Sequence, residues 1–387
     1  MSKFLPKAIL ASFMILVFFM PVFYRITPIL IGVLAVFILI DAFYHATFDF
    51  TPKNIILLGV SFFGIHLLSV FYSDFKEVAW EDVGIKFSLL LFPLLFMFKN
   101  PSVIKQKAKV LWAFVAGVLM AGIMMLARAF WVFDGQDISV FFYTKLSLFH
   151  PSYMAMYFVF SILILIDFVS AKKRRKPQLI GSMLAFSFLL VFVMLLQSKG
   201  AMLSLLVILV FYILYALWRK NKSIFLWSIS LLLVFISLIY FQPNSRIKTM
   251  NESIEKMVEE DAHITTSTGV RYEMWRVCLN AVSEHWAFGV GSGDIKPVLF
   301  KRYEVQKLED AINNNYNVHN QYLETFLGQG IIGIGLLLAL LVLAFRQALM
   351  RKSLLLSGFV LLISVSIMPE SMLNRQIGVV FIAFFFY

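Results

Sequence analysis

The sequence has very little charge and almost no cysteine. Only 14% of its 387 residues are charged, whereas soluble globular chains carry about 25%. The single cysteine, Cys278, excludes a disulfide within the chain and a cysteine-rich zinc site. The six histidines show no paired spacing typical of metal ligands. The composition therefore excludes a soluble enzyme, and the sequence predicts neither a metal nor another cofactor.

Apolar side chains dominate instead, at 60% of all residues. A helix needs about 20 apolar residues to cross the roughly 30 Å core of a bilayer. Runs of this kind predict an all-α, polytopic membrane protein with about 12 transmembrane helices. The expected spans are 8–24, 27–45, 54–72, 83–98, 109–132, 151–169, 178–197, 201–218, 223–241, 322–344, 353–368 and 376–387, the last of them short.

The positive charges predict the orientation of these spans. With the N-terminus in the cytoplasm, the cytoplasmic segments hold eighteen lysines and arginines. The opposite side holds seven outside its one long loop. Cytoplasmic loops are enriched in these residues, so both termini are expected in the cytoplasm. The net charge of +12 then needs no nucleic acid as a partner. We expect residues 1–387 to form a single integral membrane domain.

One hydrophilic segment, 242–321, is expected outside the cytoplasm between the ninth and tenth spans. Apolar residues at helical spacing predict an amphipathic helix over 245–262. A second helix is expected over 269–288, and the run Gly289–Gly293 ends it. No strand precedes this glycine run and no Gly-Lys-Ser/Thr follows it, so a turn is favoured over a phosphate loop.

His319 lies just before the tenth span, with Asn317 or Asn320 as the expected N-cap. A helix start has free N–H groups and the positive end of the helix dipole, which favour a bound anion such as phosphate. An imidazole at this place can also accept a proton. The competing interpretation is a polar histidine at the membrane interface that is hydrogen-bonded to a neighbouring loop.

Two cations and a second histidine are further candidates. Arg271 can neutralise a phosphate, or it can form an exposed ion pair with an acid such as Glu273 or Glu252. Lys199 lies at the ends of two apolar helices, where a cation usually has an anionic partner or ligand. Alternatively, its side chain extends to the membrane–water interface. His66, near the middle of the third span, is expected to make one hydrogen bond between helices.

Taken in order, these motifs resemble the O-antigen ligase/polymerase family of bacterial membrane glycosyltransferases. The resemblance covers about 145–378, and the first hundred residues match only in hydropathy. Lys199 stands where many members have Arg, which puts a bidentate grip on phosphate in doubt. The matching motifs are His150–Tyr153, Ser198–Ala201, Arg271 with Trp275, Gly289–Gly293, His319–Glu324, and the glycines Gly328, Gly330 and Gly333.

The resemblance implies a GT-C-like helical fold in the bacterial inner membrane, with the loop 242–321 and the active site facing the periplasm. The donor would be a glycan on undecaprenyl diphosphate, and lipid A–core would be the acceptor. Metal-independent, inverting transfer would use Arg271 and Lys199 to stabilise the diphosphate. His319 would be the base for the acceptor hydroxyl or a further phosphate ligand. The other predicted substrate-binding residues are Ser198, Asn320, Tyr322, Trp275 and His150.

Three other functions stay open. A polymerase of the same architecture would use another lipid-linked repeat unit as its acceptor, and a protein O-oligosaccharyltransferase would use a protein. A polysaccharide or lipid transporter belongs to a different class and predicts ionisable groups along a path through the helices. Here such groups concentrate at helix ends and in the outer loop, which favours an enzyme.

Overall fold

The computed structural model describes residues 4–45, 54–98, 104–170, 176–241 and 267–387. The regular elements in these ranges are all helices, which confirms the predicted fold class. Nine of the described helices are long and apolar enough to cross a membrane. Two shorter apolar helices, Leu354–Ser366 and Gln376–Phe386, follow near the C-terminus. The chain is therefore a multi-pass membrane protein, whereas a single domain over 1–387 and the GT-C-like arrangement stay predictions.

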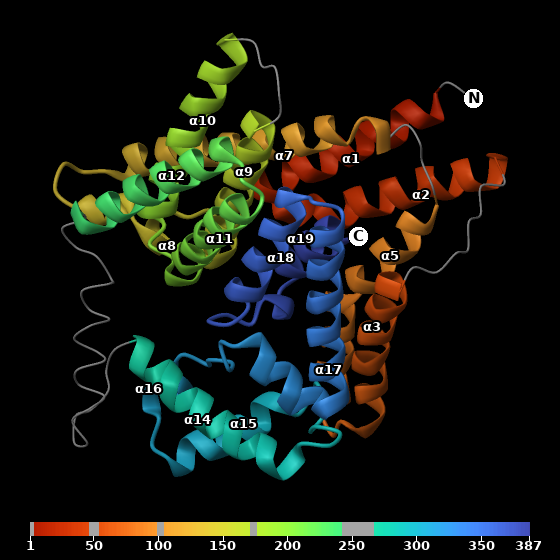
Figure 1. Ribbon diagram of the computed structural model, residues 1–387. Helices are drawn as coiled ribbons and strands as arrows, with labels where there is room; N and C mark the ends of the chain where they lie inside the picture. The colour runs from red at the N-terminus through yellow and green to blue at the C-terminus, as the bar shows by residue number, and fades with distance from the viewer. Residues whose placement is uncertain (1–3, 46–53, 99–103, 171–175, 242–266) are drawn as a thin grey trace. The chain divides into compact units, whose positions relative to one another are not determined.

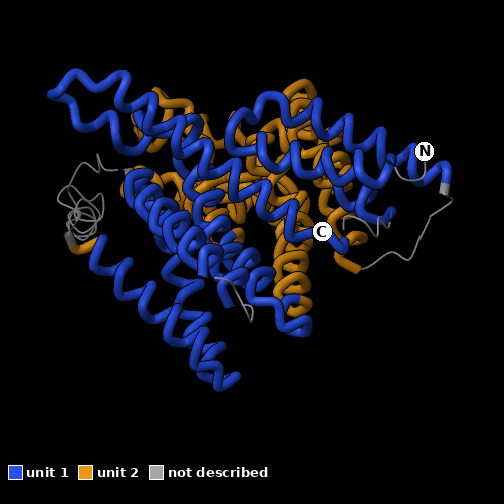
Figure 2. Tube along the Cα trace, turned by 90° about the horizontal axis from the view of Figure 1, so that it is seen from above, with its two compact units in different colours: residues 1–52, 92–238, 348–362 blue, residues 53–91, 239–347, 363–387 orange. Residues whose placement is uncertain are grey.

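The contacts group the chain into two compact units, each assembled from separate stretches of sequence (Figure 2). Unit 1 comprises 1–52, 92–238 and 348–362, and unit 2 comprises 53–91, 239–347 and 363–387. Helices α5 (Ser88–Met97) and α18 (Leu354–Ser366) contribute to both units, and so do α12 (Lys222–Phe241) and α17 (Gln321–Met350) with their last few residues.

Unit 1 is built around α9, whose residues from Tyr153 to Leu165 are buried on every side. A helix that is apolar all round is expected in the interior of a bundle. Gly117 lets α7 approach the backbone of α1 at Phe18, and these two helices run side by side (Figure 1). The principal helices of this unit are α1 (Leu5–Val22), α2 (Thr27–His45), α7 (Lys107–Val132), α8 (Tyr143–Leu146), α9 (Pro151–Ser170), α10 (Lys176–Leu195), α11 (Lys199–Trp218) and most of α12 (Lys222–Phe241).

Unit 2 combines apolar helices with a cluster of shorter, polar ones. Met274, Cys278, Leu299 and Tyr303 form a buried core among α14, α15 and α16, which lie together in Figure 1. Val318 and Leu327 extend this core to the start of α17. The helices of this unit are α3 (Asn54–Tyr72), α4 (Lys76–Lys86), α14 (Ser267–His285), α15 (Ile295–Val305), α16 (Glu309–Asn313), most of α17 (Gln321–Met350), the short η3 (Met372–Asn374) and α19 (Gln376–Phe386).

Two expectations from the sequence need comment. The span predicted over 83–98 is wrong as a single helix, because α4 ends at Lys86 and α5 begins at Ser88. Ten residues of α5 rise only about 15 Å, and α4 carries five charged side chains. The amphipathic helix predicted over 245–262 lies outside the described residues. The helix predicted over 269–288 is confirmed as α14, Ser267–His285.

The glycine run after α14 joins this helix to α17 through the backbone. Val290 N donates to Leu327 O at 2.8 Å, and Gly291 N donates to Gly328 O at 2.9 Å. Gly330 has φ 62° inside α17, where it interrupts the helical backbone. A Cβ atom at Gly330 would lie 2.3 Å from Ala287 O. The glycines therefore permit close contact between backbones, which confirms a turn at this place and gives the run a structural role.

Candidate functional site

The start of α17 fixes the position of His319. Asn320 Oδ1 accepts hydrogen bonds from Tyr322 N and Leu323 N, so Asn320 is the N-cap, as one of the two predictions had it. Asn317 Oδ1 accepts from His319 N at 3.1 Å. His319 itself has φ 50°, in the left-handed region. The two asparagines and this backbone turn place the imidazole beside the first turn of α17.

The imidazole of His319 contacts a buried carboxylate. His319 Nδ1 lies 2.7 Å from Oε1 of Glu370, whose side chain is 7% exposed. Arg271 Nη2 of α14 lies 3.5 Å from the other oxygen, Oε2. Glu370 therefore brings His319 and Arg271, 48 positions apart in the sequence, to one place.

Among the described residues, Arg271 pairs with Glu370 and not with Glu273, one of the two acids that the sequence offered as an alternative to phosphate binding. Glu273 pairs instead with Arg276, at 2.9 Å on the same helix, and Glu252 lies outside the described residues. The Arg271 side chain is 28% exposed. A guanidinium has five N–H donors, so its contact with Glu370 leaves donors for an anionic ligand.

The segment that carries Glu370 is fastened to the start of α17 by further hydrogen bonds. Asn320 N donates to Ser371 Oγ at 3.2 Å, and Gln321 N donates to Ile367 O at 2.9 Å. Leu373 N donates to Gln321 Oε1 at 2.7 Å. These bonds bind both sides of Glu370 to one helix end, so its carboxylate is held in place before any ligand arrives.

The polar side-chain atoms of Trp275 and Tyr322 both form hydrogen bonds to backbone carbonyls of the protein. Trp275 Nε1 donates to Val318 O at 3.0 Å, one residue before His319. The Tyr322 hydroxyl donates to Ser364 O at 2.8 Å. Both were predicted to bind substrate, and that role stays a prediction. Their contacts give both residues a supporting role for the segment that carries His319. Asn320, with its Oδ1 engaged as the cap, has the same role.

The other three predicted residues, Lys199, Ser198 and His150, belong to unit 1 and stand at helix starts there. Ser198 is the N-cap of α11, and its hydroxyl accepts from Ala201 N at 3.4 Å. Lys199 is the first residue of that helix. His150 precedes α9, and its carbonyl accepts from Tyr153 N at 3.1 Å. The hairpin predicted around Ser198 is confirmed, whereas the binding roles of these three residues stay predictions.

A second group of polar side chains is buried in unit 2. His66 Nδ1 of α3 lies 3.4 Å from Asp82 Oδ2 of α4, and Asp82 also pairs with Lys86. Burial raises the pKa of Asp82, but Lys86 and then His66 outweigh this and lower it to about 2. His66 thus contacts a neighbouring helix, but its ring nitrogens make no hydrogen bond to the described residues, so the predicted hydrogen bond between helices is not confirmed. The group connects α3 and α4.

The described residues do not favour catalysis by a cysteine thiolate or by a bound metal ion. Burial raises the pKa of the Cys278 thiol, which argues against a nucleophilic thiolate. No group of three His, Cys, Asp or Glu side chains among the described residues could hold a metal ion. The predicted absence of a metal remains a prediction for the whole chain.

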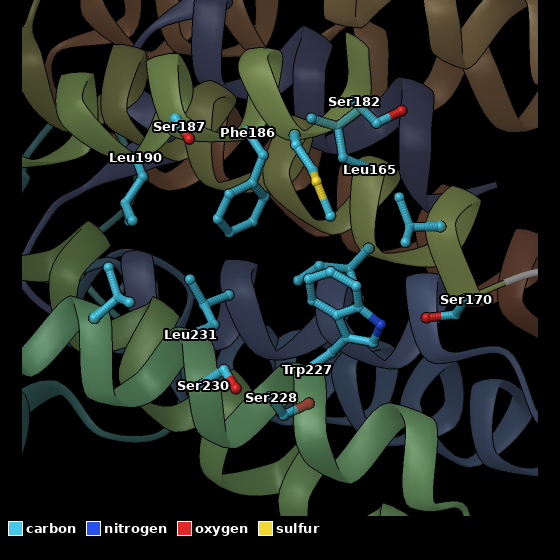
Figure 3. A pocket seen from close by; sticks show the side chains of 14 residues that line it. Leu165, Ser170, Ser182, Phe186, Ser187, Leu190, Trp227, Ser228, Ser230 and Leu231 are labelled. Atoms are coloured by element: carbon cyan, nitrogen blue, oxygen red, sulfur yellow. The ribbon is translucent and has the colours of Figure 1, made fainter. Parts of the chain in front are cut away.

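An apolar pocket of about 360 Å³ lies in unit 1 among α9, α10 and α12. Figure 3 shows Phe186 and Trp227 reaching into it from opposite walls. Its polar lining is limited to serine hydroxyls and the Trp227 indole, with no acid, base or predicted site residue. The pocket is therefore suited to hydrocarbon and offers no group for proton transfer.

Glu370 is the site residue that the sequence analysis missed. It is the only acidic residue after Glu324, and it stands between the apolar runs 353–368 and 376–387. An ionisable residue at such a turn is a signal in its own right. Its distance in sequence from His319 concealed the pairing.

Comparison with known proteins agrees with the resemblance. Residues 184–338, which include Lys199, Arg271 and His319, match the family model described as O-antigen ligase. The chain is also 25% identical over 339 residues to an uncharacterized protein of Haemophilus influenzae. That alignment covers 86% of this chain and 82% of the relative. The family match indicates a glycosyltransferase-like enzyme of the ligase or polymerase type. On these motifs, helices and matched residues, the chain is similar to the O-antigen ligase/polymerase family over residues 184–338.

Proposed function

We propose that this protein is an O-antigen ligase that transfers a glycan from undecaprenyl diphosphate to lipid A–core at the periplasmic face of the inner membrane. The observation that carries the proposal is the meeting of His319 and Arg271 around Glu370 at the start of α17. One group can accept a proton and the other can neutralise a diphosphate. Transfer from an activated donor needs both of these functions.

The proposed reaction is a single displacement. His319 Nε2 takes the proton of the acceptor hydroxyl while the acceptor oxygen forms a bond to the anomeric carbon. The bond from that carbon to the diphosphate oxygen breaks, and the diphosphate leaves with the electron pair. Arg271 stabilises the charge that grows on this leaving group. Attack from the side opposite the diphosphate inverts the anomeric centre.

A strain that lacks the gene tests this function. The strain is supplied with wild-type protein, His319→Ala, or His285→Ala, and its lipopolysaccharide is separated on a gel. His285 is an exposed histidine at the end of α14 and serves as the matched control. A positioned general base contributes roughly 10²- to 10⁴-fold, so His319→Ala should remove the polymer from lipid A–core. His285→Ala should restore it.

The pattern on the gel separates the related functions. Long lipid-linked polymer that accumulates without reaching lipid A–core supports a ligase. A single capped repeat on the core would identify a polymerase instead. An unchanged ladder in the deletion strain would point to protein glycosylation or transport and would refute the ligase proposal. Full restoration by His319→Ala would refute only the proposed role of His319 and would leave the ligase function standing.

A further inference from the structure

Glu370 contacts both proposed catalytic residues from a segment outside the motifs that revealed them. Its two oxygens are divided between them, with Oε1 toward His319 Nδ1 at 2.7 Å and Oε2 toward Arg271 Nη2 at 3.5 Å. The residue is 5% exposed. A buried carboxylate is costly unless charged or hydrogen-bonding partners compensate it. Two of the partners that compensate Glu370 are thus the residues on which the proposed reaction depends.

The contact with His319 determines which ring nitrogen can take a proton. An ionised carboxylate only accepts hydrogen bonds, so the nitrogen that faces Glu370 must carry the hydrogen. With Nδ1 protonated, a neutral imidazole has its lone pair on Nε2. When Nε2 takes the proton of the acceptor, the ring becomes positive, and the adjacent carboxylate stabilises that charge.

We infer that Glu370 is a positioning residue that fixes the tautomer and orientation of His319. This inference rests on the proposed function, because it assigns Glu370 a part in the same transfer. Glu370 acts through His319 and needs no contact with the donor or the acceptor. The proton stays on His319, and the carboxylate remains ionised throughout.

The surrounding hydrogen bonds separate this role from a purely structural one. Ser371, Ile367 and Leu373 bind the start of α17 through atoms that do not belong to Glu370. The segment should therefore keep its place when the carboxylate is replaced by an amide of the same shape. Glu370→Gln removes the charge and leaves these bonds intact.

The test measures transfer by purified protein from an undecaprenyl-diphosphate-linked glycan to lipid A–core. Glu370→Gln should lower kcat about 100-fold, within the range of a positioned base, without raising the KM for the donor. Glu370→Asp retains the charge and should recover at least about tenfold of that loss. Glu273→Gln is the matched control, since Glu273 also pairs with an arginine of α14, and it should retain near-normal kcat.

A double variant provides the measurement that a structural role would not reproduce. If Glu370 acts through His319, adding Glu370→Gln to His319→Ala should cost no further activity, because residues that act as a unit are not additive. A further tenfold loss in that background would overturn the inference. A kcat of the single variant Glu370→Gln within about threefold of the wild-type value would also overturn the inference.

The same assay keeps the two proposals apart. Full activity of His319→Ala would refute the base itself, whatever Glu370 does. An inactive His319→Ala together with an active Glu370→Gln would refute the inference and leave the base standing. If Glu370→Gln cannot be purified as folded protein, Glu370→Asp takes its place in the double variant. A further tenfold loss there would overturn the inference in the same way.

Discussion

Two arginines one and a half turns apart on α14 have different surroundings. Arg271 is 28% exposed and contacts the carboxylate that also holds His319. Arg276 is 58% exposed and pairs with Glu273 of its own helix. Arginine can grip a phosphate through two parallel N–H groups, whereas lysine offers a point charge. The two positions therefore provide a test and its control on one helix.

Arg271→Lys should lower transfer at least tenfold while the amount of protein in the membrane stays unchanged, because lysine loses the planar, bidentate fork. Transfer from the lipid-linked donor and the membrane content are measured in parallel. Arg276→Lys should remain close to wild type. Near-normal transfer by Arg271→Lys would remove the proposed contact with diphosphate.

The buried pair of Asp82 and Lys86 makes a prediction about stability. Lys86→Met leaves Asp82 without its closest positive partner, and breaking a buried pair costs about 3–5 kcal/mol. The melting temperature in detergent should fall by several degrees. The double variant Asp82→Leu/Lys86→Met removes both charges and should recover most of the loss. Equal melting temperatures for the single variant and the wild type would contradict this.

Asp82 also predicts how stability changes with pH. Its pKa in the folded protein is about 2, below the ordinary 3.8, chiefly because Lys86 and His66 outweigh the opposing effect of burial. The stabilisation is therefore complete above about pH 4 and is lost as the pH falls toward 2. Because His66 next to Asp82 also titrates, the comparison is made between His66→Gln and His66→Gln/Asp82→Asn, whose difference in melting temperature should be constant from pH 5 to 8. It should shrink below pH 4, and a difference that grows on acidification would contradict the assignment.

Among the elements, the contact between the glycine turn and α17 determines where the site lies. The turn ends α14, which carries Arg271, and it bonds to the backbone of α17, whose start carries His319. Ile331 N donates to Trp286 O at 2.8 Å just beyond the interruption at Gly330. The two halves of the site therefore depend on glycines at a place where two backbones meet.

Gly330→Ala should lower both the melting temperature and transfer. The residue has φ 62°, and a Cβ atom would lie 2.3 Å from Ala287 O, so α14 and α17 would have to separate. The expected cost exceeds about 2 kcal/mol. Gly335→Ala on the same helix is the control, since no atom lies within 4 Å of its added Cβ. That variant should be neutral or more stable by up to about 1 kcal/mol. Similar behaviour of the two variants would argue against the close approach.

At the scale of the whole molecule, the charge bias between loops predicts which side of the membrane carries the site. Residue 310 lies in α16, which contacts α14 and α15. Arg271 is on α14, and His319 follows α16 in the sequence. A phosphatase fused at residue 310 should be active, because this reporter is active only when it is located in the periplasm. A fusion at Lys220, in a predicted cytoplasmic loop, should be inactive. The reverse pattern would invert the topology and place the proposed reaction on the wrong face.

The sequence by itself determined the class of the molecule, the helices that are long and apolar, the helix predicted over 269–288 and the turn that ends it. These follow from local composition and periodicity, which act within a few residues. Local rules were insufficient at α4 and α5, where a continuous apolar reading of 83–98 overlooked the break at Phe87. Asp82 pairs locally with Lys86 of its own helix, whereas its contact with His66 of α3 exists only in the folded chain.

The tertiary structure alone decided which candidate residues share a site and what completes it. His319, Arg271 and Glu370 come from three separate stretches, and no periodicity relates their positions. The same fold gives Asn320, Tyr322 and Trp275 contacts that support the segment that carries His319, while their roles in substrate binding stay predictions. Pairing between distant segments depends on packing and on compensating a buried charge, and only the assembled chain establishes both.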